Sequence, residues 1–432
     1  MTGKHKIKII TLGCSKNVVD SEKLLRQIKA GGCGVVNDEK DNSADTVLIN
    51  TCGFINDARE ESIDTILQQV LRKKTGSIGS LYVFGCLSQR YRDQLKTEIP
   101  EVDGWYGVDN AGDILKELNI RFVPENKPDR MLSGPGHYAY LKISEGCSRA
   151  CSFCAIPQIR GRYISRPVED VVEEAYILAG KGVKELILIA QDLSYYGTDL
   201  YNKPKLPRLV EELLKIESFE WIRLHYLYPA AINYDLIPLI KANSRICRYI
   251  DIPVQHITDR MLGLMKRSHN RKDTEALLVT LRDELPDAAI RTTLIAGHPG
   301  ETKEDFSELK KFVSDFRFNR LGVFAYSHEE GTYSCNSYKD DISPGIKASR
   351  VSELMEIQQE ISAGMNRLLT GKTLKVIIDG REGAYFTGRT EHDSPEIDQE
   401  VLISSDFRMV PGNYYNIRIT RSAEYDLFGI PV

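Results

Sequence analysis

The chain has 432 residues, of which 42% are hydrophobic and 27% are charged, and its formal net charge is −4. This composition excludes collagen-like, coiled-coil and largely disordered proteins. The slightly negative charge excludes a global basic field that would draw the whole protein onto nucleic acid. At roughly 100–200 residues per domain, two to four domains are expected.

The start of the chain and its apolar runs indicate the compartment. The first residues, MTGKHKIKIITLGC, contain too short an apolar run for a secretory signal. The longest apolar runs, such as Leu186 to Ala190, fall far below the roughly 18 residues of a membrane helix. We therefore expect a cytoplasmic protein with no membrane partner. In that compartment, nine cysteines indicate metal binding or redox chemistry rather than structural disulfides.

Strands and helices alternate in the first segment. KIKIITLG, TVLINT and LYVFG are typical of strands, and the patterns between them predict helices over Ser21–Ala30, Asn56–Lys74 and Gln89–Glu98. This βαβαβα order predicts an α/β domain with a doubly wound parallel sheet over residues 1–122. The stretch VPENKPDRMLSGPG, residues 123–136, has Pro and Gly punctuation and predicts a linker.

A second alternating series covers residues 137–365. Its predicted strands are YLKIS, ELILIAQD, WIRLHYL, YIDIPVQ, IRTTLIAG and RLGVFAYS. Among the helical patterns, one places Val168, Val171, Val172, Ala175, Tyr176 and Ala179 on a single face. Three more predicted helices are PRLVEELLKI, TEALLVTLRDEL and EDFSELKKFVSDF. A long helix from Ala348 to Leu369 closes the series. Six β/α units are too few for an eight-unit barrel, so a partial barrel or an open parallel sheet fits.

The last stretch, residues 366–432, changes character. LKVIIDG, AYFTGRT, EVLISS and NYYNIRIT are short alternating strands separated by turn residues. They predict a small five-stranded antiparallel barrel, a type that often binds polymers.

The strongest chemical signal is EGCSRACSFCAIP, in which Cys147, Cys151 and Cys154 stand four and three residues apart. Cubane iron–sulfur clusters take thiolates at such spacing, and three ligands leave the fourth iron open for chemistry. The alternative is a zinc loop, but zinc usually needs a fourth ligand from a second CxxC or a His pair. No His follows closely on the C-terminal side, so the spacing favours a 4Fe-4S cluster.

A second signal is positional. Cys14, Cys52 and Cys86 each follow a predicted strand and precede a helix. In a parallel sheet these strand ends share the edge where ligands bind, and helix N-termini favour thiolates. Three unrelated buried cysteines are the alternative. Equivalent places in three successive units favour a second three-thiolate cluster.

The motif with Phe153 as its aromatic residue resembles the signature of radical S-adenosylmethionine (SAM) enzymes, and the six β/α units match that superfamily's partial barrel. Over essentially the whole chain the sequence resembles the methylthiotransferases. The matching segments include TLGCSKNVVDSE, INTCGFI, FGCLSQRY, CAIPQIRGRYISRP and LIAGHPGET. The resemblance implies an N-terminal cluster domain, a radical SAM core and a C-terminal TRAM barrel of OB-like type, with two 4Fe-4S clusters and SAM as cofactors.

By the same resemblance, the open iron beside Cys147, Cys151 and Cys154 chelates SAM, and the backbone at Phe153 contacts its adenine. Gln191 and Asp192 end one barrel strand, and Gly297, Gly300 and Glu301 follow another, so these residues are expected near SAM. A tight βα turn explains the two glycines equally well. Beyond the cluster ligands, no catalytic residue is assigned. Cys33, Cys247 and Cys335 are interpreted as structural or incidental.

Within the family, the segments look most like the branch that modifies an aspartate of ribosomal protein S12. The sister branch modifies adenosine in tRNA and usually has an Arg soon after the counterpart of Cys52, where this chain has Gly53-Phe54-Ile55. The turn from Asp393 to Glu396 also resembles the S12 branch, whereas His298 departs from the commoner Phe. The implied partners are S12, free or in the 30S subunit, and an electron donor such as flavodoxin or ferredoxin. The resemblance names no sulfur source.

Charge offers a separate argument about the substrate. Residues 370–432 contain seven Lys and Arg against ten Asp and Glu. A tRNA-binding barrel is expected to be basic, whereas an acidic one suits a basic ribosomal protein. The alternative is that Glu391, Asp393, Glu396, Asp398 and Glu400 form a solvated hairpin. Tyr385, Tyr414 and Tyr415 are expected in the barrel core, with base stacking as the alternative. A third hypothesis, a non-catalytic iron–sulfur redox sensor or RNA-binding module, does not explain the six β/α units.

Overall fold

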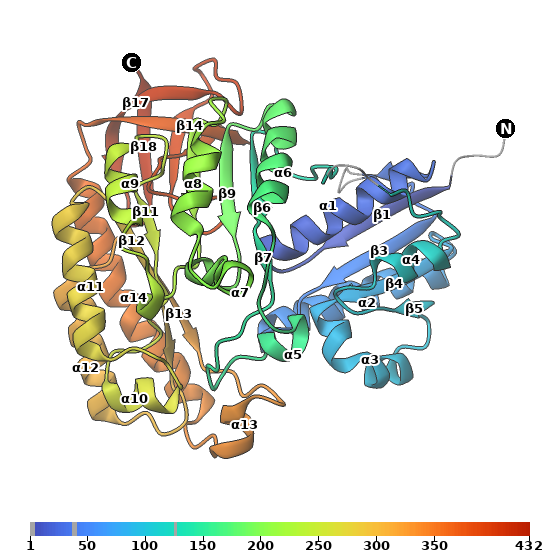
Figure 1. Ribbon diagram of the computed structural model, residues 1–432, viewed down its shortest axis with the longest axis horizontal. Coiled ribbons are helices and arrows are strands. Elements are labelled where there is room, and N and C mark those ends of the chain that lie inside the picture. The colour runs from blue at the N-terminus through green and yellow to red at the C-terminus, as the bar shows by residue number, and fades with distance from the viewer. Residues whose placement is uncertain (1–4, 37–40, 125–127) are drawn as a thin grey trace. The chain divides into compact units, whose positions relative to one another are not determined.

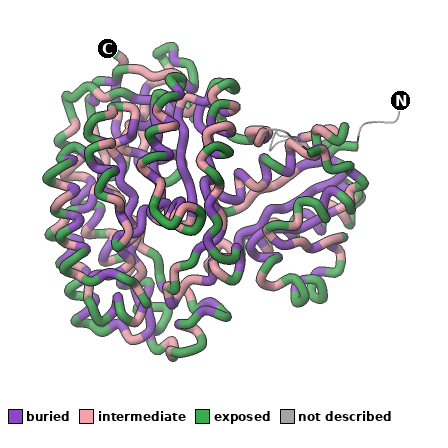
Figure 2. The backbone as a smooth tube through the Cα atoms, in the orientation of Figure 1, coloured by how far each residue is buried: buried purple, intermediate pink, exposed green. Residues whose placement is uncertain are grey.

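The computed structural model describes residues 5–36, 41–124 and 128–432. The chain forms two compact units. The first contains Met1–Gly134, Tyr140–Arg149 and Ala155–Ile177, and the second contains Pro135–Ala139, Ala150–Cys154 and Leu178–Val432. Within each unit, buried residues follow the strands and exposed residues lie on the outer sides of the helices (Figures 1 and 2). No helix in the described ranges is long and apolar enough to cross a bilayer.

A parallel sheet of five strands in the order β2-β1-β3-β4-β5 organises the first unit. The strands are β1 Lys6–Thr11, β2 Gly34–Val36, β3 Thr46–Thr51, β4 Ser80–Gly85 and β5 Gly104–Trp105. Helices α1 (Ser15–Ala30) and α4 (Ala111–Glu117) bury apolar residues on one face, and α2 (Asn56–Lys74) and α3 (Cys86–Glu98) on the other. This arrangement confirms the doubly wound prediction. The order of the strands reverses between β1 and β3, where such sheets bind ligands.

Several boundaries in this unit differ from the prediction. Helix α1 begins at Ser15 rather than Ser21, and α3 begins at Cys86 rather than Gln89. The missed first turns of both helices are short and lie at the cysteine turns, where the helical period has only one or two apolar residues to show it. The short elements β2, β5 and α4 were not predicted, because a few residues show no periodicity. The unit also contains β7 (Ser144–Glu145), α5 (Ile156–Arg160), β8 (Ile164–Ser165) and most of α6 (Val168–Gly180). On α6, Val171 and Ala175 of the predicted face are fully buried, whereas Tyr176 is 55% exposed at its margin.

The predicted linker 123–136 has no helix or strand in its described part, and residues 125–127 lie outside the described ranges. Its middle part is nevertheless held in place by a buried side chain. Arg130 is 1% exposed and pairs with Glu22 of α1 at 2.8 Å and with Glu174 of α6 at 3.0 Å. Ser133 donates its backbone N–H to the same Glu22 carboxylate at 2.9 Å. A buried guanidinium held by two carboxylates therefore fixes this segment against α1.

All six predicted strands of the central series are present, in two sheets ordered β10-β9-β6 and β11-β12-β13. The pairs β9–β10, β11–β12 and β12–β13 are parallel. They are β6 Tyr138–Lys142, β9 Glu185–Ile189, β10 Trp221–Leu224, β11 Tyr249–Asp251, β12 Ala289–Ala296 and β13 Arg320–Ala325. Of β6, only the first two residues belong to the second unit. A backbone bond from Leu227 N–H to Asp251 O at 2.9 Å joins the two sheets. The strands therefore form the predicted partial barrel.

Helices cover the second unit's strands (Figure 1). The longer ones are α8 Leu206–Leu214, α9 Leu236–Ala242, α11 Arg271–Glu284, α12 Lys303–Phe316 and α14 Pro344–Arg367. Four were predicted, whereas α9 was missed. The short elements α7 Thr198–Tyr201, α10 Asp259–Leu264, α13 Tyr333–Ser337, η1 Leu193–Tyr195 and η2 Pro229–Ala231 were missed as well.

The C-terminal strands close into a five-stranded barrel in the order β14-β15-β16-β18-β17. They are β14 Thr373–Glu382, β15 Tyr385–Arg389, β16 Glu400–Ser404, β17 Tyr414–Ser422 and β18 Asp426–Pro431. The barrel is not wholly antiparallel as predicted, because β16 and β18 pair in parallel. Tyr415 packs against the barrel core. The ring centroid of Tyr414 lies 4.9 Å from that of Trp221 in β10, and Tyr385 is 40% exposed.

Buried ion pairs join this barrel to the partial barrel inside the second unit. In the loop between β15 and β16, Asp393 pairs with Arg320 of β13, and Asp398 accepts from the Tyr249 hydroxyl at 2.7 Å and lies 3.6 Å from Arg291. The side chains of Asp393 and Asp398 are 0% and 3% exposed. Both the acidic-surface and the solvated-hairpin interpretations are therefore wrong for these two carboxylates. They neutralise buried arginines.

We predict that Asp393→Ala lowers the free energy of unfolding by about 3–5 kcal/mol, because it leaves the Arg320 guanidinium buried and unpaired. Glu424→Ala is the matched control, since Glu424 is an exposed acid of the same barrel. It should change stability by less than about 0.5 kcal/mol. Chemical denaturation of both variants measures the difference, and equal small effects would contradict the buried pair.

Candidate functional site

Three thiols of the first unit lie at the carboxyl edge of its sheet. Cys14 precedes α1, Cys52 follows β3, and Cys86 begins α3 directly after β4. A side-chain carbon placed on Gly13 would lie 2.6 Å from the Cys52 Cβ, so the β1–α1 turn touches the β3–α2 turn. Gly13 also has φ +89°, a conformation that glycine adopts without strain. The sheet therefore brings the predicted cysteine segments together.

Asn17, in the first turn of α1, touches all three cysteine segments. Its amide nitrogen donates to Leu12 O at 2.8 Å and to Thr51 O at 3.2 Å. Leu12 lies two residues before Cys14, and Thr51 lies directly before Cys52. Its carbonyl oxygen lies 3.9 Å from the Cys86 Sγ. The two donated bonds fix the orientation of the amide, so the oxygen must face Cys86.

Cys52 and Cys86 are buried, with 9% and 4% of each residue exposed. Burial raises the pKa of the Cys86 thiol to about 12, while the neighbouring Arg160 guanidinium opposes that shift. Burial also raises the pKa of Cys52, and Cys14 adds to that increase. In the described ranges no group of three His, Cys, Asp or Glu side chains has ready-made metal-site geometry. Three thiols within electrostatic reach of one another, beside a guanidinium, nevertheless form a donor set that fits an iron–sulfur cluster.

The second cysteine motif is divided between the two units. In the first, Cys147 is buried; its N–H donates to Gly161 O at 3.1 Å, and its sulfur accepts from the Arg149 N–H at 3.5 Å. In the second, the Cys154 N–H donates to Cys151 O at 3.2 Å, so these two cysteines share one turn.

Arg267 of the second unit contacts the motif. Its guanidinium donates to the Cys151 Sγ at 3.4 Å and to Pro253 O at 2.7 Å, and it lies over the Tyr228 ring at 4.2 Å. A donor to a ligand sulfur stabilises the thiolate that a cluster needs. Neither Arg267 nor Asn17 was predicted, because a lone polar residue after a helix or in its first turn has no pattern of its own.

The residues expected near SAM lie in the second unit. Asp192 is 2% exposed, and its carboxylate accepts from the Ser194 N–H at 2.9 Å. Glu301 is 4% exposed, accepts from the Gly297 N–H at 2.6 Å and pairs with Arg350 at 2.9 Å. Gly297 and Gly300 have φ +78° and +80°, as a tight turn requires. Phe153 and Gln191 are half-buried.

His298 ties the second cysteine motif to a neighbouring helix. The imidazole is fully buried, and its Nε2 lies 2.9 Å from the Ser334 hydroxyl and 3.4 Å from that of Ser152. Ser152 lies between Cys151 and Cys154, and Ser334 belongs to α13. The departure from Phe at this position therefore adds hydrogen bonds beneath the motif.

The three remaining cysteines lie elsewhere. Cys247 is buried in the cluster of Trp221 and Tyr249, and Cys33 packs against the apolar core of the first unit. Cys335 lies in α13, and its N–H donates to Thr332 Oγ1 at 3.2 Å. These positions agree with a structural role.

We predict that Gly13→Ala lowers the iron retained after anaerobic reconstitution, because the new methyl group displaces the Cys52 side chain. Gly32→Ala is the matched control. Gly32 also has positive φ, at +91°, but has no atom within 4 Å of the new carbon. Both variants carry a backbone cost of about 1–3 kcal/mol, so equal iron contents would contradict the contact between the cysteine turns.

We predict that His298→Phe makes stability less dependent on pH. Burial lowers the pKa of His298 to about 4 from 6.5. At a pH between these two values the unfolded chain binds a proton at this imidazole and the folded chain does not. The free energy of unfolding therefore decreases as the pH falls below 6.5. Between about pH 7.5 and 5.5 this histidine contributes roughly 1 kcal/mol of that loss. Urea denaturation of the parent chain and the variant at both pH values measures this contribution. If the free energy of unfolding falls by the same amount in both proteins, the imidazole is not neutral and buried as the structure indicates.

Three family models match the chain. "Uncharacterized protein family UPF0004" matches residues 6–107, "Radical SAM superfamily" residues 141–313, and "TRAM domain" residues 370–432. A solved structure of the radical S-adenosylmethionine methyltransferase TsrM from Kitasatospora setae superposes with a TM-score of 0.52 at 14% identity, covering 74% of this chain and 75% of that chain. The radical enzyme OxsB gives a TM-score of 0.52 at 13% identity, over 83% of this chain and 62% of that one. These likenesses show a shared fold.

Known relatives match at far higher identity. Proteins named ribosomal protein uS12 methylthiotransferase RimO, from Phocaeicola vulgatus and Cytophaga hutchinsonii, are 49% and 50% identical over 426 and 427 residues. The matches cover 98% and 99% of this chain, and 99% and 98% of the relatives. The chain therefore belongs to the uS12 methylthiotransferase family of radical SAM enzymes.

Proposed function

We propose that this chain adds a methylthio group to the β-carbon of an aspartate in ribosomal protein uS12, in the cytoplasm. The observation that carries the proposal is that Cys14, Cys52 and Cys86 lie at one sheet edge within electrostatic reach of one another, in a chain that also has the radical SAM motif. Two separate three-cysteine sites suit a reaction that needs both radical generation and sulfur transfer.

Cys147, Cys151 and Cys154 would hold one 4Fe-4S cluster, and Cys14, Cys52 and Cys86 the other. With SAM bound, the first site supplies the radical that removes hydrogen from an unactivated carbon, which no side-chain base does readily. The contact of Arg267 with the Cys151 Sγ orients that ligand. Glu301 holds the turn that begins at Gly297, so it acts as a positioning residue for SAM. Phe153, Gln191, Asp192 and Gly300 complete the proposed SAM site.

The proposed partners are uS12, free or in the 30S subunit, and an electron donor such as flavodoxin or ferredoxin. The substrate assignment rests on the relatives, because two of the acids behind the charge argument are buried. An anaerobic reaction with SAM and reductant tests it, with an S12 loop peptide and bulk tRNA in separate tubes. Mass spectrometry should find the methylthio group on the peptide. A methylthio group on tRNA alone would overturn the proposed substrate.

We predict that two cysteine variants separate the two sites. Cys151→Ala should abolish both SAM cleavage and methylthio transfer, because it removes a ligand of the radical site. Cys86→Ala should abolish methylthio transfer while reductive SAM cleavage continues. Cys247→Ala is the control, since Cys247 lies in an apolar cluster, and it should retain both activities. Chromatography of cleaved SAM and mass spectrometry of the peptide provide the two measurements. Full methylthio transfer by Cys86→Ala would contradict the assignment of Cys14, Cys52 and Cys86 as cluster ligands.

A further inference from the structure

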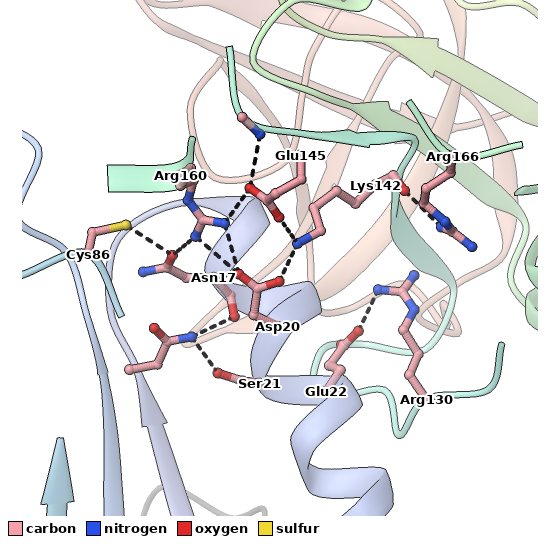
Figure 3. A network of polar contacts seen from close by, with 12 residues as sticks. Asn17, Asp20, Ser21, Glu22, Cys86, Arg130, Lys142, Glu145, Arg160 and Arg166 are labelled. Carbon is pink, nitrogen blue, oxygen red and sulfur yellow. Dashed lines mark hydrogen bonds and ion pairs between the residues drawn. The ribbon is translucent and has the colours of Figure 1, made fainter. Parts of the chain in front are cut away.

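Arg160 is a buried cation beside the three-cysteine site, and it comes from a different part of the sequence. It ends α5, which follows the second cysteine motif, and its side chain is 2% exposed. Its guanidinium donates to Asn17 Oδ1 at 2.7 Å, Asp20 Oδ2 at 3.0 Å and Glu145 Oε1 at 2.9 Å (Figure 3). All these residues belong to the first unit. The N-terminal site is thus completed by residues beyond the N-terminal domain.

The guanidinium and the Cys86 sulfur lie on either side of one oxygen atom. The Asn17 Oδ1 accepts from Arg160 and lies 3.9 Å from the Cys86 Sγ (Figure 3). The Asn17 nitrogen is already committed to Leu12 O and Thr51 O, so the amide cannot reverse without breaking those bonds. In addition, the Asn50 side chain donates to the backbone carbonyl of Asn17 at 2.9 Å, which holds the first turn of α1 in place. Arg160 is therefore connected, through the side-chain amide of Asn17, to all three cysteine segments.

The ion-paired side chains around Arg160 form a charge-balanced set, and the exposed Asp109 adds one carboxylate within electrostatic reach. Arg160 and Lys142 are the cations, and Asp20 and Glu145 are the anions. A cluster held by three thiolates adds negative charge, and reduction adds one more. Buried charges are weakly screened, so a fixed cation next to one ligand favours the more negative, reduced form.

We propose that Arg160 is a positioning residue for the N-terminal site, which orients Asn17 against the cysteine segments and raises the reduction potential of the cluster bound there. This inference rests on the proposed assignment of Cys14, Cys52 and Cys86 as cluster ligands. Asp20 lowers that reduction potential, because its carboxylate offsets part of the Arg160 charge.

Potentiometry followed by electron paramagnetic resonance tests the inference. The full-length chain carries Cys147→Ala, Cys151→Ala and Cys154→Ala, so that the N-terminal site alone binds a cluster. In this background, Arg160→Met should lower the ratio of reduced to oxidised cluster at a fixed potential by roughly tenfold, which corresponds to ~59 mV for one electron. Asp20→Asn should raise that ratio. Arg166→Met is the matched control, because Arg166 is an arginine of the same unit that pairs with Glu174 instead. It should leave the potential unchanged.

The opposite signs keep the test decisive where one variant folds poorly. If Arg160→Met does not fold, a rise in Asp20→Asn alone supports the inference and an unchanged potential overturns it. Equal potentials in all variants, or shifts in the same direction for Arg160→Met and Asp20→Asn, would overturn it while leaving the cluster assignment intact. Failure of the background chain to bind any iron would overturn both the cluster assignment and the inference that rests on it.

Discussion

The structure depends on arginines that are removed from water and neutralised by carboxylates from distant parts of the chain. A buried guanidinium without a partner is so costly that each one dictates where an acid must lie. Arg130 and Arg160 impose this constraint in the first unit, and Arg223 and Arg389 share Glu185 in the second. Because the partners are far apart in sequence, these pairs specify tertiary arrangement rather than local structure.

In the first unit, the constraint connects domain architecture to the candidate site. Arg130 fixes a segment without regular structure against α1, and α1 carries Asn17 beside the thiols. Arg160 then contacts Asn17 and Asp20 of the same helix. The residues that surround the N-terminal cysteines thus come from three stretches of sequence. The compact unit therefore crosses the boundary between the N-terminal domain and the core that we predicted from sequence.

In the second unit, the same physics changes what the acidic C-terminal barrel means. Asp393 and Asp398 count toward a negative charge in the sequence, but they are internal counter-ions of Arg320 and Arg291. A net charge summed over a domain says little about its surface when several of its charges are buried. The substrate assignment consequently rests on the relatives and on the reaction, not on the electrostatics of the barrel.

The sequence by itself determined the alternation of strands and helices, the six-strand core and the two sets of three cysteines, because periodicity and spacing are local properties. The strand-end positions of Cys14, Cys52 and Cys86 also predicted their convergence, since parallel strands share one edge. Only the tertiary structure decided that Asn17 and Arg160 join them, that the 123–136 segment is packed, and that β16 pairs in parallel with β18. Each of these depends on contacts between residues far apart in the chain, and such contacts leave no periodic trace in the sequence.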